Sequence, residues 1–149
     1  MINDNIKATG ELTVVLKDGN GNTKEERKIP NLVVTVGKNF IASRMTSAPP
    51  AVMSHMAVGS TNTAPVAADT TLAAQLGTRA ALTVVGGTAV ANVITYNATF
   101  APGIGTGAIV EAGIFNASTA GTMLARTVFS VVNKDAADTL TVSWALTIS

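Results

Sequence analysis

The chain has 149 residues, a formal net charge of +1 and no cysteine, and only 13% of its residues are charged. The lack of cysteine excludes disulfides, thiolate metal sites and thiol catalysis. A net charge this close to zero also argues against a general role in neutralising nucleic-acid phosphates, so we expect no nucleic-acid partner.

The length and the hydrophobic pattern predict one soluble domain. No apolar run approaches the roughly 18–20 residues of a membrane-spanning helix. The first residues, MINDNIKATGE, lack the basic and apolar blocks of a signal peptide. We therefore expect a protein made in a cytoplasm, with no membrane partner. Residues 1–10 are expected to form a flexible arm, and residues 11–149 a single domain.

An N-terminal hairpin is predicted in the most charged part of the chain. The segments ELTVVLK and TKEERKI flank DGNGN, whose Asp-Gly and Asn-Gly pairs supply the positive φ angles of a tight turn. Twelve of the nineteen charged side chains lie at or before Arg44, and the rest of the chain holds seven. A surface so poor in charge is often covered by another subunit. The alternative is a small domain, rich in alanine, threonine and glycine, that needs few charges.

A short helix and further strands are predicted after the hairpin. Apolar residues at helical spacing indicate a helix from about Val36 to Thr46, which ends before the prolines of SAPP. A long surface loop with one helical turn near Leu72 is expected at residues 61–78. Strands are expected at residues 52–60, 79–85, 92–100, 108–116, 123–132 and 139–149.

The last predicted strand, TLTVSWALTIS, has the strictest alternation of apolar and polar residues. Its even-numbered residues should face a core, and its odd-numbered residues should face outward. We expect Trp144 to be largely buried, with these neighbours: Tyr96, Phe100, Phe129, Leu140 and Val142. Seven or eight short strands indicate an all-β protein, an antiparallel sandwich or barrel rather than an α/β domain. Of the two, we expect an antiparallel β-sandwich of jelly-roll type with one short helix and an N-terminal hairpin.

Three short motifs suggest ligands or modification but have simpler explanations. GIGTG, residues 103–107, resembles the start of a dinucleotide fingerprint, but no helix is predicted after it, so we expect a flexible hairpin loop and no cofactor. VGKN lacks the remaining residues of a P-loop and is expected at a helix start. Asn97 and Asn116 match the glycosylation pattern, but without a signal peptide we expect neither to be modified and Asn116 to open a turn.

No set of catalytic residues is apparent. His55, the single histidine, follows Ser54, but adjacent residues of a strand point to opposite faces, so we expect these side chains to diverge. One histidine cannot lead a zinc site. Glu111 is isolated from other acids and is expected to pair with Arg126 or Arg79, which leaves no carboxylate pair for glycosidase chemistry. We therefore expect no catalytic, cofactor or metal residues, no small-molecule substrate and no enzymatic activity.

Three stretches of the chain resemble small virion proteins of tailed bacteriophages. They are NLVVTVGKNFIASRM, MSHMAVGSTNTAP and EAGIFNASTAGTMLARTVFSVVNKDAADTLTVSWALTI, and the likeness extends over residues 11–149. Such proteins are described as structural, capsid-decorating or tail-fibre-associated. The resemblance therefore implies a part of the virion, made in the bacterial host cytoplasm, and leaves its place in the particle open.

Three hypotheses follow from the composition and the resemblance. The first is a capsid cement or decoration protein that stabilises contacts between major capsid proteins, a task that needs broad contact surfaces rather than a pocket. The second is a structural protein associated with the tail, collar or fibre. The third is an enzyme or a carbohydrate-binding module, but exposed aromatic residues beside acids are not evident in the loops.

Two contact surfaces are expected under the first hypothesis. The poorly charged strands would mediate self-association, with a trimer favoured and a dimer possible. The arm and hairpin, with Lys24, Arg27 and Lys28 on the exposed strand, would contact the major capsid protein or another virion protein. Charged contacts suit that second role because they set register and partner choice more than affinity.

Overall fold

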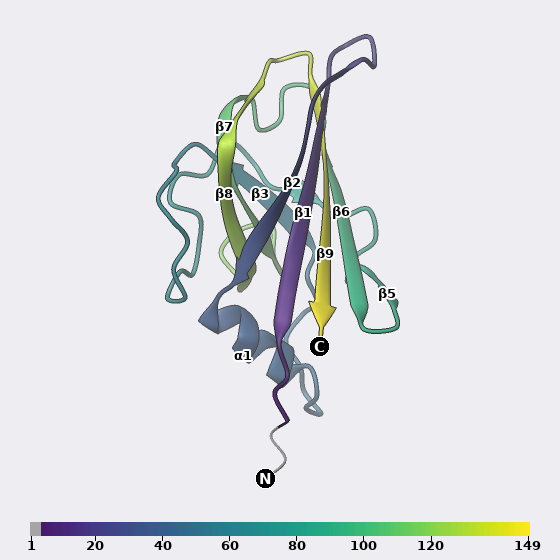
Figure 1. Ribbon diagram of the computed structural model, residues 1–149, viewed down its shortest axis with the longest axis vertical. Coiled ribbons are helices and arrows are strands. Elements are labelled where there is room, and N and C mark those ends of the chain that lie inside the picture. The colour runs from purple at the N-terminus through teal and green to yellow at the C-terminus, as the bar shows by residue number, and fades with distance from the viewer. Residues whose placement is uncertain (1–3) are drawn as a thin grey trace.

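The computed structural model describes residues 4–149, and within that range it contains nine strands and one helix (Figure 1). In chain order the elements are β1 (Ala8–Lys17), β2 (Thr23–Val33), α1 (Thr35–Ser43), β3 (His55–Gly59), β4 (Ala80–Ala81), β5 (Thr88–Val90), β6 (Val93–Phe100), β7 (Gly107–Phe115), β8 (Met123–Lys134) and β9 (Thr139–Ile148). No helix in this range is long and apolar enough to cross a membrane.

The strands form one antiparallel sheet in the order β4-β3-β7-β8-β2-β1-β9-β6-β5. The sheet curls into a half-barrel, and β2 belongs to both halves: residues 23–31 pair with β1, whereas Leu32 and Val33 pair with β8. Beyond β4, a bridge between Leu82 and Ala98 brings the chain back to β6. The all-β, antiparallel prediction is confirmed. A jelly-roll sandwich is not confirmed, because one continuous sheet runs through both halves.

The concave side of the half-barrel holds the main hydrophobic core. On β9 the even-numbered residues 140–146 are at most 1% exposed, as the alternation predicts. Trp144 is 1% exposed and lies opposite Leu12 on one neighbouring strand and Tyr96 on the other. The predicted burial of Trp144 is confirmed, and its five expected neighbours all belong to this core or pack against it.

Residues of the opposite parity form the convex side of β2, β1, β9 and β6, which we call the outer face. Figure 1 shows these strands at the front, with no other element across them. Two of its cross-strand rows are Lys28–Thr13–Ser143–Asn97 and Glu26–Val15–Thr141–Thr99.

The convex side of the other half is covered by the loop of residues 60–79. Leu72 of this loop joins a second apolar cluster that contains Phe115 of β7. Glycines on the strands leave room for the loop: a Cβ at Gly113 would lie 2.8 Å from the Leu72 side chain, and one at Gly59 would lie 2.6 Å from the carbonyl oxygen of Ala74. The loop therefore packs directly on β3 and β7.

Helix α1 packs against β8 with equally little space. A Cβ at Gly37 would clash with the carbonyl group of Leu124, so a glycine lets the helix approach the strand backbone. The α-helix ends at Ser43, and backbone hydrogen bonds continue the turn to Thr46. The predicted helix at residues 36–46 is confirmed, but it starts one residue earlier, at Thr35, and its α-helical part ends three residues earlier, at Ser43.

Three local predictions differ from the structure. Residues 61–78 contain no regular helical turn near Leu72, because contacts with the sheet fix the loop in an irregular path. The strand expected at residues 79–85 is reduced to Ala80–Ala81. Residues 8–10, assigned to the flexible arm, belong to β1, which pairs with β9 along its whole length, and residues 1–3 lie outside the described range.

Replacing Trp144 by alanine tests the core. The substitution would leave a cavity in place of a large buried side chain, so the free energy of unfolding should fall by roughly 3–5 kcal/mol. Urea denaturation followed by circular dichroism measures this loss. Trp144 is the only tryptophan, so an emission spectrum of the unaltered protein typical of water-exposed indole would contradict the burial.

Candidate functional site

Lys24, one of the three residues expected to bind a partner, is tied to another loop of the same chain. Its ammonium nitrogen lies 2.8 Å from a carboxylate oxygen of Asp138 and 3.2 Å from one of Asp135, both between β8 and β9. The hydrogen bond with Asp138 raises the pKa of Lys24, and the same bond is the main cause that lowers the pKa of Asp138. Lys24 therefore joins the hairpin to the β8–β9 loop.

Arg27 and Lys28, the other two expected contact residues, point to opposite sides of β2. The Nη2 atom of Arg27 donates hydrogen bonds to Glu25 at 3.1 Å and to the carbonyl oxygen of Val131 at 3.3 Å. Lys28 is exposed and lies beside Thr13 on the outer face. The structure does not bring the three predicted residues together, because successive residues of a strand alternate between faces.

The Lys24–Asp138 pair predicts how stability depends on pH. Because the pKa of Asp138 is lower in the folded state, the pair stabilises the fold above the ordinary aspartate pKa of about 4, and this stabilisation is lost as the pH falls through the lowered value. Asp138→Asn should reduce stability at neutral pH and make stability depend less on pH in the acidic range. Urea titrations at neutral and acidic pH measure both effects.

Asp135→Asn provides the matched control for this prediction. The Asp135 side chain is 78% exposed, whereas that of Asp138 is 4% exposed. The control should therefore change the pH profile less. If the stability of the two variants depended on pH in the same way, the assignment of the pH dependence to the buried carboxylate of Asp138 would be wrong.

Ser54 and His55 contact each other, contrary to the prediction that their side chains diverge. Ser54 Oγ lies 2.8 Å from His55 Nδ1. The reason is that β3 begins at His55, so Ser54 precedes the strand and the alternation of faces does not apply to it. Among residues 4–149 no carboxylate hydrogen-bonds the imidazole, so the pair lacks the orienting group of a catalytic triad.

A buried ion pair joins β7 and β8 on their convex side. Glu111 and Arg126 are 0% and 1% exposed, and Arg126 Nε and Nη2 lie 3.0 and 2.8 Å from one oxygen of Glu111. Of the two arginines expected to pair with Glu111, Arg126 is the one that does so. The carboxylate also accepts the backbone N–H groups of Ala73 and Ala74 at 3.3 and 2.9 Å. The pair therefore fixes the loop of residues 60–79 to the sheet.

Asp69 of the loop completes this cluster. One of its oxygens lies 3.0 Å from Arg126 Nη1 and also accepts the backbone N–H of Val66 at 2.9 Å. The carbonyl oxygen of Thr63 accepts a further hydrogen bond from Arg126 Nη2 at 2.9 Å. Nη1 and Nη2 of Arg126 thus bond the loop directly, whereas Nε bonds only Glu111.

A second arginine, Arg79, holds the turn between β7 and β8. Its guanidinium carbon lies 3.6 Å from the centre of the Phe115 ring, and Nη1 donates to the carbonyl oxygens of Ala117 and Ala120 at 2.9 and 2.8 Å. Asn116 opens this turn, as predicted. Its side-chain oxygen accepts a hydrogen bond from the backbone N–H of Thr122, at the other end of the turn.

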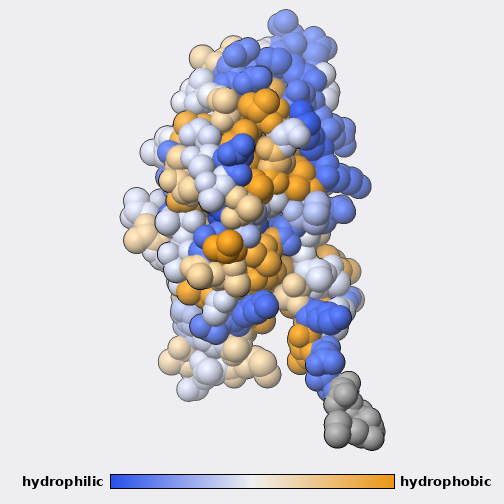
Figure 2. All heavy atoms as spheres, turned by 60° about the vertical axis from the view of Figure 1, so that its left-hand side comes forward, coloured by the Kyte–Doolittle hydropathy of each residue, from blue (hydrophilic) through white to orange (hydrophobic). Residues whose placement is uncertain are grey.

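All seven charged residues after Arg44 make contacts inside the chain. In addition to those above, Lys134 is 1% exposed and donates to the carbonyl oxygen of Ala101 at 3.0 Å. In Figure 2 hydrophilic residues gather towards the hairpin end and along one edge, whereas most of the remaining surface in view is pale or orange. The few charges of this region therefore stabilise loops and turns.

Substitutions at Glu111 and Arg126 test the role of the buried pair. Glu111→Gln leaves a buried arginine without its full countercharge, so the free energy of unfolding should fall by about 3–5 kcal/mol. The double variant Glu111→Leu, Arg126→Met buries neither charge of the pair, so it should lose less stability than the sum of the losses in the single variants Glu111→Leu and Arg126→Met. Urea denaturation measures stability, and limited proteolysis should show faster cleavage within residues 60–79 in the single variants. An unchanged cleavage rate would contradict the assigned role.

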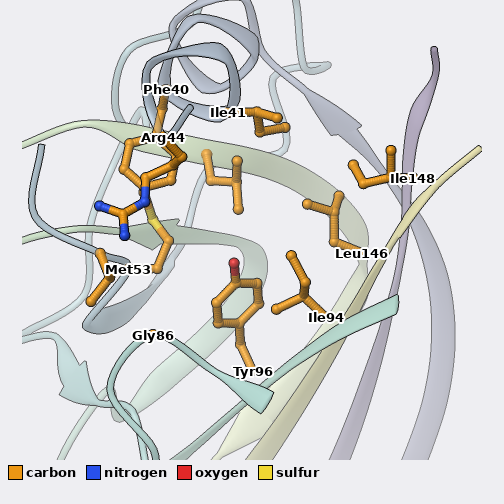
Figure 3. A pocket seen from close by; sticks show the side chains of 11 residues that line it. Phe40, Ile41, Arg44, Met53, Gly86, Ile94, Tyr96, Leu146 and Ile148 are labelled. Carbon is orange, nitrogen blue, oxygen red and sulfur yellow. The ribbon is translucent and has the colours of Figure 1, made fainter. Parts of the chain in front are cut away.

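An apolar cavity of about 260 Å³ lies beneath α1 (Figure 3). Its walls come from α1, β6, β8 and β9 and from the segments around Met53 and Gly86, and apart from Arg44 and Tyr96 the lining residues are apolar. The Tyr96 hydroxyl points into the space, and burial raises its pKa above the usual value of 10.0. The sequence pattern placed Tyr96 in the core but gave no sign of a space beside it.

The glycine-rich motif has a different setting from the one predicted. Residues 103–107 do not close a hairpin: β6 pairs with β9 whereas β7 pairs with β3 and β8, so this loop crosses between the two halves of the sheet. Gly105 packs closely there, since a Cβ would lie 2.9 Å from the Val58 side chain. Within the part of the chain that the structure describes, no three potential metal-ligating side chains gather.

Comparisons of this chain with protein-family models, with curated proteins and with solved structures find no match.

Proposed function

We propose that the chain is a non-enzymatic structural protein of a tailed-bacteriophage virion, and that it acts as a capsid cement or decoration protein that stabilises contacts between major capsid proteins. The resemblance of residues 11–149 to small virion proteins supports this role. The structural observation that carries the proposal is the outer face, a broad strand surface across which no described segment packs. A surface of this kind suits extended contact with another protein.

The chemistry of the outer face differs from one side to the other. On β9 and β6 it carries no charged residue and is rich in threonine, including Thr141 and Thr99. Charges such as Glu26 and Lys28 come from the β2 and β1 side. Hydroxyl groups can exchange hydrogen bonds across an interface without the desolvation cost of an ion, whereas charges set partner choice.

This division refines the two contact surfaces expected from the sequence. Lys28 and its charged neighbours would contact the major capsid protein or another virion protein, and the β9–β6 side would contact copies of the same chain. We favour a trimer, with a dimer as the alternative. Lys24 and Arg27 are engaged within the fold, so Lys28 is the strongest of the three proposed contact residues.

The same proposal extends to architecture and location. We propose that the halves β4-β3-β7-β8 and β2-β1-β9-β6-β5 act as the two layers of a jelly-roll-like subunit. The protein would be made in the host cytoplasm and incorporated into the virion. A tail, collar or fibre position is the competing assignment, and the number of copies per particle distinguishes the two.

Charge reversal at Lys28 tests the proposal. Lys28→Glu should weaken binding to particles that lack the protein, with the difference decreasing at high salt, because an exposed charged contact is screened. Co-sedimentation with purified particles followed by gel quantification measures occupancy. Lys38→Glu makes the same charge change on α1, away from the outer face, and should bind normally.

Copy number decides between the two locations. Many copies per particle, distributed over the shell, would support a capsid role, whereas few copies at one vertex would replace it with a tail or collar role. Unaltered occupancy by Lys28→Glu at every salt concentration would show that the contact surface has been assigned wrongly.

A further inference from the structure

The cavity beneath α1 has no part in the proposed virion role. It lies on the concave side of the sheet, opposite the outer face, and Figure 3 shows Ile94, Leu146 and Ile148 on one side of it and Arg44 on the other. Its volume of about 260 Å³ is just below the roughly 300–1,000 Å³ of small-molecule pockets, which suits a ligand smaller than a drug.

Tyr96 places a free hydroxyl inside this cavity. Tyr96 as a whole is 5% exposed, its hydroxyl makes no hydrogen bond to residues 4–149, and the hydroxyl oxygen itself stays open to solvent in the cavity. Water therefore serves as its hydrogen-bond partner, and a ligand in the cavity can take the place of that water. The backbone of Gly87 packs directly against the Tyr96 ring, since a Cβ at Gly87 would lie only 2.7 Å from it. The ordinary pKa of a tyrosine hydroxyl is 10.0 and burial raises the pKa of Tyr96 further, so the hydroxyl is protonated at neutral pH and can donate a hydrogen bond.

Arg44 supplies a positive charge at the same cavity. Its guanidinium donates from Nη1 to the carbonyl oxygen of Pro50 and lies 6.0 Å from the centre of the Phe40 ring. It forms no ion pair with the described part of the chain. Arg44 is exposed, whereas Arg126 is buried and paired, so the charge of Arg44 faces solvent and is available to an anion.

We infer that this cavity binds a small apolar acid, with its hydrocarbon part among Ile94, Leu146 and Ile148 and its carboxylate towards Arg44 and the Tyr96 hydroxyl. The apolar walls provide the hydrophobic contribution, and the two polar groups select an anionic head. A medium-chain fatty acid has this chemistry. The limited volume favours the free acid over the whole of a membrane lipid. The inference does not rest on the proposed virion role.

Calorimetry with decanoate tests this assignment. The unaltered protein should bind decanoate with saturation at one molecule per chain, and decanol, which lacks the charge, should bind at least about tenfold more weakly, as the loss of a charge-assisted hydrogen bond implies. Arg44→Gln should reduce decanoate affinity by a similar factor and leave decanol affinity nearly unchanged. Tyr96→Phe should reduce decanoate affinity by a smaller factor.

Two controls keep the test decisive. Lys38→Gln removes a positive charge from the same helix at a residue that does not line the cavity, and it should bind decanoate normally. Ile41→Trp, with folding verified by circular dichroism, should fill the space and abolish binding. Equal affinity for decanoate and decanol, or no saturable binding, would overturn the inference. Binding to phosphatidylglycerol vesicles but not to decanoate would overturn it in favour of a membrane-surface contact.

Discussion

The buried ion pair between Glu111 and Arg126 determines which side of the sheet remains open. It holds the loop of residues 60–79 against β3, β7 and β8, where Leu72 can then bury its side chain. Removing two charges from water is costly, so the pair is useful only because backbone groups of the loop and Asp69 complete its hydrogen bonds. One half of the curled sheet is thereby covered by the chain itself, while the outer face of the other half is left bare.

This asymmetry gives a more specific meaning to the low charge of the chain after Arg44. The composition alone suggested a surface covered by another subunit. In the structure the seven charges of this region hold loops and turns: the Glu111 cluster fixes one loop, and Asp138 connects the hairpin to another. The outer face of β9 and β6 is consequently free of charge, because the charged residues of this region hold loops and turns elsewhere. An uncharged face is compatible with contact between copies of the chain.

The strands were predictable where one face is buried, and the rest depended on contacts that a single sequence does not reveal. β9 and β6 follow a period of two because a hydrophobic core lies on one side only. The segment after Arg79 is equally apolar, but only Ala80–Ala81 pair regularly there. Ser54 and His55 show the same limit, since the alternation rule depends on a strand boundary that the sequence did not locate. The cavity was not predicted, because the periodicity of apolar residues indicates which way each side chain points and not how tightly the side chains pack together.

The position of β1 limits how the hairpin can serve as a contact element. The sequence suggested that the hairpin, together with the arm, contacts a partner, but β1 lies between β2 and β9, and Leu12 lies opposite Trp144 in the core. Removing residues 1–10 would delete the part of β1 that pairs with the end of β9, so any loss of partner binding would be mixed with a loss of stability. Reversing Arg27 would similarly disturb its contact with Glu25. A side chain on the outer face, such as Lys28, can be changed without touching the core, because the alternation that buries Leu12 and Val14 directs Thr13 and its neighbour Lys28 outward.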